Sequence, residues 1–224
     1  MSNFPVKDRS PLRFNSSSDA GRRPGFLALV IVAVLAGIVG GALTEGLVLR
    51  VSHQLEPLTQ TAAPWVIVVS AVALLARNIR EAVVLSVITF LALVLGFYLA
   101  QETRGWSVSH HQAAFWFAAS FVAGPLIGLA VGWLRYSSRL LGGVGAGLIG
   151  GIFVGEAIYG LRERSLSTSA AYWHVQIVVG VVLWVGAVLW ACRRRLSRSA
   201  SAFAASMGSA AVFALATYLA YKLP

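Results

Sequence analysis

Seven long apolar segments, separated by short polar loops, constrain this chain more than any other feature. In order, they cover residues 25–49, 63–76, 81–100, 112–134, 140–160, 171–192 and 200–221. A helix that crosses the ~30 Å apolar core of a bilayer needs about 20 mostly apolar residues. The sequence therefore predicts an all-α fold, a polytopic transmembrane helical bundle with seven spans.

Composition excludes an ordinary soluble domain. Hydrophobic residues make up 58% of the chain and charged residues 12%, with a mean hydropathy of +0.76, whereas soluble domains have about 25% charged residues. The apolar runs are continuous rather than alternating, which argues against a β-barrel. The weakest span is 63–76, whose apolar run is short and has Pro64 at its start. We expect this span to begin earlier, near Leu58. If that segment were only re-entrant, every later span would reverse its direction.

Loop charge predicts the orientation. With the amino terminus in the cytoplasm, the inner segments hold 13 of the 18 lysines and arginines. These residues are Lys7, Arg9, Arg13, Arg22, Arg23, Arg77, Arg80, Arg135, Arg139, Arg193, Arg194, Arg195 and Arg198. Because positive residues resist translocation, we expect the amino terminus inside and the carboxyl terminus outside. Dropping the second span would scramble this alternation, so the bias also supports seven spans.

The same distribution argues against a nucleic-acid partner, despite a net charge of +10. The basic residues occur as one cluster per loop, without aromatic residues between them that would stack on bases. Residues 1–24 are polar and contain three prolines, so we expect a disordered cytoplasmic tail. Residues 25–222 form the predicted seven-helix transmembrane domain.

Glycines at four-residue spacing predict close helix contacts. They lie on one face of the segment 140–160, as Gly143, Gly147, Gly151 and Gly155, and on one face of 25–49, as Gly37 and Gly41. Small residues let helix backbones approach closely in lipid. We expect these two faces to pack on each other within one bundle. Docking onto a second copy or onto a partner membrane protein is the alternative.

Polar and aromatic side chains gather toward the predicted outer face. Glu156 lies about 24 Å along its helix from Leu140, where an ionised carboxylate is costly unless it is paired, protonated or hydrated. The sequence therefore suggests an outward-facing polar cup that takes a small solute or a cation. Its candidate residues are Glu156, Glu45, Tyr159, His174 and Trp116. The alternative is that the two glutamates merely reach the interfacial water.

Catalysis has no support in the sequence. It contains no nucleophile elbow, no zinc-binding His-Glu-x-x-His and no phosphate-binding Gly-Lys-Ser/Thr loop. The adjacent pair His110 and His111 is a poor metal site, because neighbouring residues on a helix point about 100° apart. We expect no enzyme, no cofactor and no metal.

Four short segments carry a family resemblance: residues 96–98 (GFY), 115–117 (FWF), 124–128 (GPLIG) and 151–159 (GIFVGEAIY). They resemble landmarks of a family of uncharacterised seven-helix integral membrane proteins from high-GC Gram-positive bacteria. The likeness covers roughly residues 25–222. It implies a multi-pass protein of the bacterial inner membrane and leaves the activity open, since the family is a domain of unknown function.

The favoured function is a small solute-binding or transport unit built around the polar cup. The alternative is an accessory or structural membrane protein that grips a partner through its glycine faces.

Overall fold

The computed structural model describes residues 25–48, 50–51, 57–164, 168–192 and 199–220. The predicted disordered tail, residues 1–24, and the basic run 193–198 lie outside the described residues.

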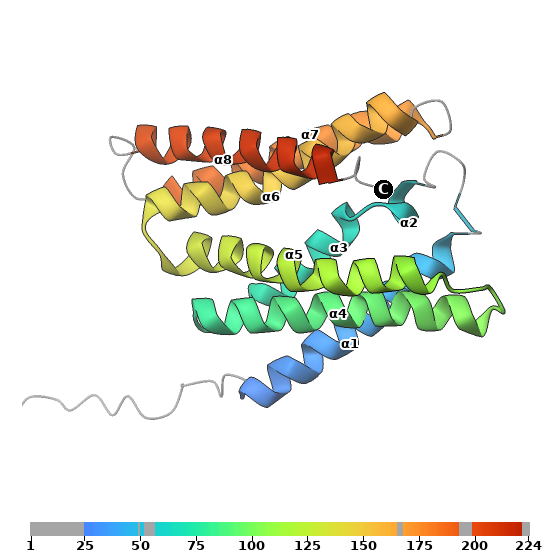
Figure 1. The fold of residues 1–224 in the computed structure, drawn as a ribbon. Coiled ribbons are helices and arrows are strands. Elements are labelled where there is room, and N and C mark those ends of the chain that lie inside the picture. The colour runs from blue at the N-terminus through green and yellow to red at the C-terminus, as the bar shows by residue number, and fades with distance from the viewer. Residues whose placement is uncertain (1–24, 49, 52–56, 165–167, 193–198, 221–224) are drawn as a thin grey trace, which may run out of the picture.

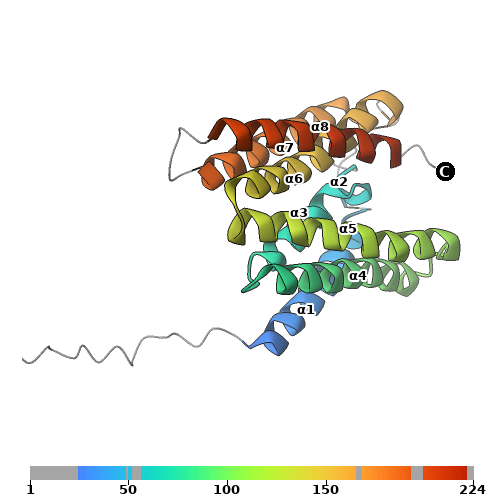
Figure 2. The same cartoon turned by 60° about the vertical axis from the view of Figure 1, so that its left-hand side comes forward.

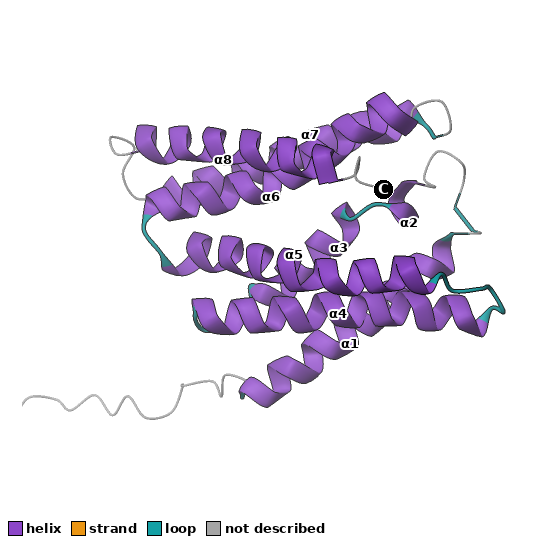
Figure 3. Ribbon diagram, in the orientation of Figure 1, coloured by secondary structure: helices purple, strands orange, loops and turns teal. Residues whose placement is uncertain are grey.

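The described part of the chain consists of helices joined by loops and contains no strand (Figure 3). Its helices are α1 (Phe26–Leu47), α2 (Pro57–Gln60), α3 (Ala63–Ala73), α4 (Ile79–Thr103), α5 (His110–Tyr136), α6 (Arg139–Tyr159), α7 (Ala170–Cys192) and α8 (Ser199–Ala220). A π-helical turn, Gly160–Arg164, extends α6.

Six of these helices are long and apolar enough to cross a membrane: α1, α4, α5, α6, α7 and α8. Their ends lie within three residues of the predicted spans. The protein is therefore an all-helical, multi-pass membrane protein, as the apolar runs predicted.

The second predicted span differs from the other six. Its helix, α3, has only 11 residues, which is about 16 Å at 1.5 Å per residue and half of a ~30 Å apolar core. Pro64 accounts for its late start, because a proline ring clashes with the carbonyl four residues earlier, at Gln60, and breaks a continuous helix. The result is two pieces, α2 and α3, joined through Thr61 and Ala62.

Polar side chains cap three of the long helices where the loops meet them. Asn78, Ser109 and Ser138 accept hydrogen bonds from backbone N–H groups in the first turns of α4, α5 and α6, which satisfies donors that a helix leaves unpaired. Glu81 also pairs with Arg77 at 2.9 Å, and this hydrogen bonding raises the pKa of Arg77.

The helices form two layers with α3 between them. In Figures 1 and 2, α6, α7 and α8 make one layer, and α1, α4 and α5 make the other. Successive helices alternate in direction, with α1, α4, α6 and α8 running one way and α3, α5 and α7 the other (Figure 1). We call the two ends of the bundle the Tyr136 end, where α5 finishes and α6 begins, and the His110 end opposite.

Glycine contacts pair the helices differently from the prediction. A Cβ on Gly37 would lie 2.6 Å from the Thr89 carbonyl oxygen of α4, and one on Gly41 would lie 2.7 Å from the Phe97 nitrogen. A Cβ on Gly151 would lie 2.6 Å from the Ala210 oxygen of α8.

The expected packing of segment 25–49 on segment 140–160 is therefore wrong. The glycine face of α1 packs on α4, whereas the face of α6 formed by Gly143, Gly147, Gly151 and Gly155 packs on α8. Both faces are filled within the same chain, because the atoms that a Cβ on these glycines would meet belong to α4 and α8. They are consequently not open for gripping a partner protein.

Candidate functional site

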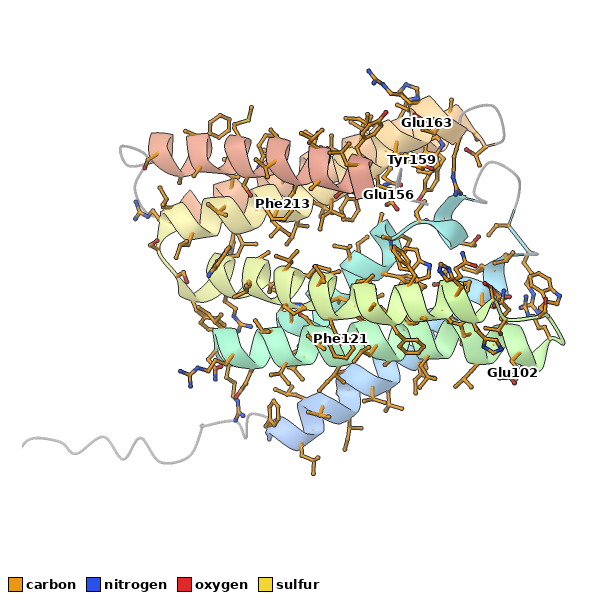
Figure 4. All side chains as sticks on the ribbon, in the orientation of Figure 1. Glu102, Phe121, Glu156, Tyr159, Glu163 and Phe213 are labelled. Atoms are coloured by element: carbon orange, nitrogen blue, oxygen red, sulfur yellow. The ribbon has the colours of Figure 1, made fainter. Side chains whose placement is uncertain are left out.

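Glu156 caps the start of the short helix α3. Its Oε1 accepts a hydrogen bond from the Ala62 N–H at 2.7 Å, and its Oε2 accepts one from the Ala63 N–H at 3.0 Å. The side chain is 1% exposed, and Figure 4 shows it directed from α6 toward α2 and α3. One carboxylate therefore joins α6 to the start of α3.

The position of this carboxylate follows from the backbone of α3. The first N–H groups of a helix have no partner within the helix, and inside a membrane no bulk water replaces that partner. Pro64 removes one such donor, since proline has no N–H. Glu156 takes the N–H groups of Ala62 and Ala63, and its negative charge is favourable beside the positive end of the helix dipole.

A second polar side chain, from α7, completes this cap. Gln176 Nε2 donates to Glu156 Oε2 at 2.9 Å and to the Phe153 carbonyl oxygen at 3.3 Å. Gln176 is 5% exposed, and its Oε1 has no hydrogen-bond partner among the described residues. We call Glu156, Gln176 and the N–H groups of Ala62 and Ala63 the cap site.

The segment that links α2 to α3 has another tie to α7. The hydroxyl groups of Thr61 and Tyr172 lie 3.1 Å apart, within hydrogen-bond distance. Thr61 is 7% exposed. The break between α2 and α3 is therefore enclosed and anchored by side chains of α6 and α7 together.

Aromatic rings surround the other side of the first turn of α3. The ring of Trp65 makes edge contacts with Phe90, Phe97 and Trp116, at centroid distances of 5.9, 5.8 and 6.0 Å. Its indole Nε1 donates to Thr44 Oγ1 on α1 at 3.3 Å. The first turn of α3 thus contacts α1, α4, α5 and α6.

Glu45, the other candidate carboxylate, lies next to this cluster through its neighbour Thr44. It is 1% exposed, and its Oε1 lies 3.8 Å from Arg104 Nη1, which also donates to the Glu45 backbone oxygen at 3.1 Å. Glu45 Oε1 has no hydrogen bond among the described residues. The two buried glutamates therefore have separate partners, in line with the separate helix pairings of α1 and α6.

The far end of α3 carries the opposite charge. Arg135 Nη1 donates to the carbonyl oxygens of Leu74 and Ala76, the latter at 3.3 Å, and the Tyr136 hydroxyl donates to the Ala76 oxygen. A cation is favourable at the negative end of a helix dipole. The carboxylate of Glu156 at one end and the guanidinium of Arg135 at the other thus hold α3, a helix too short to place both of its ends in water.

The remaining candidates lie around the cap site rather than in an open cup. Tyr159 is half-buried, and its ring lies 6.3 Å from that of Tyr218 on α8. The His174 side chain is exposed, with Nδ1 2.8 Å from the Ala170 oxygen of its own helix. Trp116 contacts the site through Trp65. Glu156 and Glu45 are enclosed, so in this conformation they do not line a cup open to water.

Sequence reasoning missed Gln176, Thr61 and Arg104. Gln176 carried a usable signal, because an amide within an apolar span is costly unless it is hydrogen-bonded. The roles of Thr61 and Arg104 depend on contacts between distant segments, and no local pattern marks them.

The comparisons with known proteins agree with the family resemblance. Residues 20–223 match the model of a family described as a family of unknown function (DUF6518). No curated protein and no solved structure matches the chain.

Proposed function

This chain belongs to the family of unknown function DUF6518, and from its geometry we propose that it is a solute-binding or transport protein of the bacterial inner membrane. Its working part is the broken second span, residues 57–76. The observation that carries the proposal is the capture of the start of α3 by Glu156, at 2.7 and 3.0 Å.

Broken helices support such a role in general. Many transporters bind their substrates at discontinuous helices, whose free N–H groups face anionic groups inside the membrane. In this protein a side chain of the same molecule occupies that position. The carboxylate of Glu156 can exchange its hydrogen bonds with the helix end for a bond to a solute. The hydrogen bonds within a continuous helix cannot be exchanged in this way.

The chemistry of the cap site favours a proton or a small cationic solute. Protonation of Glu156 would weaken its hold on the N–H groups of Ala62 and Ala63, because a neutral acid is a poorer acceptor than a carboxylate. A cation would find the carboxylate of Glu156 and the amide oxygen of Gln176 on neighbouring helices. Movement of α2 and α3 would then open the enclosed residues to the His110 end, as the outward-facing cup requires.

The topology belongs to the same proposal. In the proposed arrangement the segment 57–76 crosses the membrane despite its break, which gives seven crossings with the amino terminus inside and the carboxyl terminus outside. Two contacts support it: the start of α3 binds Glu156 near the end of α6, while residues 74 and 76 bind Arg135 and Tyr136 at the end of α5.

Reporter fusions test this topology. Fusions after Arg50 and after Arg77 should report opposite compartments, as should fusions after Arg198 and Lys222. The first pair is decisive, because it brackets only the broken span. If the fusions after Arg50 and Arg77 report the same side, the segment is re-entrant and the seven-span arrangement fails.

Ligand-dependent thermal stability tests the function. Purified protein is screened with small ammonium compounds, amino acids and monovalent cations across a range of pH. We expect at least one of them to raise the melting temperature, and Glu156→Gln to abolish that shift because it removes the charge from the cap site.

The matched control is Glu102→Gln, which removes a carboxylate from an exposed position at the same end of the bundle (Figure 4). It should leave the shift intact. A stabilising ligand that acts equally on both variants would bind elsewhere and would contradict the proposal, as would a screen in which no compound stabilises the protein.

The accessory role is less favoured. In that role the protein would bind a partner through the glycine faces of α1 and α6, but α4 and α8 already fill these faces.

A further inference from the structure

A hollow at the Tyr136 end of the bundle lies apart from the cap site. Its volume is about 470 Å³, and its lining residues are Asn78, Ile79, Arg80 and Tyr136. The first three belong to the start of α4 and the last to the end of α5. The hollow thus opens where two membrane-length helices end, which is the depth of lipid headgroups.

The hollow contains the positive charge of Arg80, which no described carboxylate pairs with. Arg77 pairs with Glu81 at 2.9 Å, and Arg135 donates to the carbonyl oxygens that follow α3. Arg80 is exposed and has no acidic partner among the described residues. Its guanidinium is therefore available to an anion, with the positive end of the α4 dipole beside it.

Apolar surface adjoins the charged residues. Val84 lies one helical turn beyond Arg80, on the same face of α4, and is 43% exposed. Leu74 and Leu75, which follow α3, are 48% and 50% exposed. A phosphate held by Arg80 would thus have hydrocarbon-facing side chains next to it, an arrangement that suits a phospholipid better than a soluble anion.

We propose that this hollow binds the phosphate headgroup of an anionic phospholipid. The Arg80 guanidinium supplies the charge, and the Asn78 amide lines the same space. Tyr136 lines the hollow from α5, and the acyl chains follow Val84 along α4. Because Tyr136 and Arg135 also hold the end of the broken span, bound lipid braces the residues that anchor α3.

The test uses delipidated protein in detergent and three probes: dihexanoyl phosphatidylglycerol, dihexanoyl phosphatidylcholine and inorganic phosphate. Binding is followed by the melting temperature and by native mass spectrometry. We expect phosphatidylglycerol to stabilise the protein and to remain bound, while phosphatidylcholine and phosphate at the same concentration do neither.

Arg80→Gln should weaken phosphatidylglycerol binding about fivefold, which corresponds to the ~1 kcal/mol that one arginine contributes near an anionic surface. The control is Arg162→Gln, an exposed arginine in the turn after α6, at the other end of the bundle. It should bind phosphatidylglycerol as the unmodified protein does.

Three results would overturn the proposal. The first is stabilisation by inorganic phosphate equal to that by phosphatidylglycerol, which would indicate a site for a soluble anion. The second is binding of phosphatidylcholine as strong as that of phosphatidylglycerol. The third is an equal loss of phosphatidylglycerol affinity in Arg80→Gln and Arg162→Gln. Arg80 is exposed, so Arg80→Gln should keep its melting temperature without lipid. None of these outcomes depends on the cap site or on a transported solute.

Discussion

Glu156→Leu is expected to lower the free energy of unfolding by about 2–6 kcal/mol. The substitution leaves two buried backbone N–H groups, those of Ala62 and Ala63, without the acceptor they have now, and each unsatisfied buried donor costs about 1–3 kcal/mol. The amide of Gln176 loses its partner as well. The measurement is the melting temperature of purified protein in one detergent.

Two further variants separate the cap from the charge. Glu156→Gln retains one carbonyl oxygen that can accept from Ala62 or Ala63, so we expect an intermediate loss. Glu102→Leu removes an exposed carboxylate in the last turn of α4. It should leave the melting temperature within about 1 °C of the original, since surface changes rarely exceed 0.5 kcal/mol. A Glu156→Leu protein as stable as the Glu102→Leu protein would show that α3 does not need the carboxylate.

Stability and function are distinguishable at this residue. If Glu156 is only a structural cap, Glu156→Gln will lower stability without changing any ligand-induced shift in the melting temperature. If the cap site also binds a proton or a cation, the same variant will lose the ligand-induced shift in the melting temperature as well.

Gly147→Leu should be the second strongly destabilising change. A Cβ at this position would overlap the Ser206 carbonyl oxygen of α8 and lie 2.9 Å from the Ala210 nitrogen, so α6 and α8 must move apart. Overfilling a packed contact costs about 1–3 kcal/mol. The loss should be larger here, because α8 packs mainly on α6 and small residues set their close approach.

The matched control is Gly208→Leu on α8. A Cβ on Gly208 would meet no atom within 4 Å, so a leucine there should be tolerated and should leave the melting temperature nearly unchanged. Both variants replace a helical glycine by leucine and gain the same helix propensity. Equal melting temperatures for the two proteins would mean that α6 and α8 do not meet through Gly147.

The sequence by itself determined the elements that depend on local composition. The long apolar runs set six membrane-length helices, because a span needs only length and hydrophobicity to be stable in lipid. It also singled out Glu156 by the cost of an intramembrane carboxylate, and the glycine faces by their spacing. Each of these inferences uses residues that are neighbours in the chain.

Only the tertiary structure decided which helix faces meet. The spacing of Gly37 and Gly41 on α1 is the same as that of Gly147 and Gly151 on α6, so spacing alone cannot distinguish a contact with each other from contacts with α4 and α8. The choice depends on small residues and on side-chain shape at matching heights of all the helices, which no single segment contains. For the same reason, the sequence alone did not predict that α3 has only 11 residues, or that Glu156 and Arg135 bind its two ends.

The case of α3 shows the physical reason most clearly. An 11-residue helix inside a membrane exposes unpaired N–H and C=O groups at its ends, and it becomes stable only when other segments supply acceptors and donors. Here Glu156, from 93 residues further along the chain, and Arg135, from 61 residues further along, supply them. Composition predicted only that residues 63–76 are apolar. The packing of α5, α6 and α7 around them decided that they contain a short helix capped at both ends.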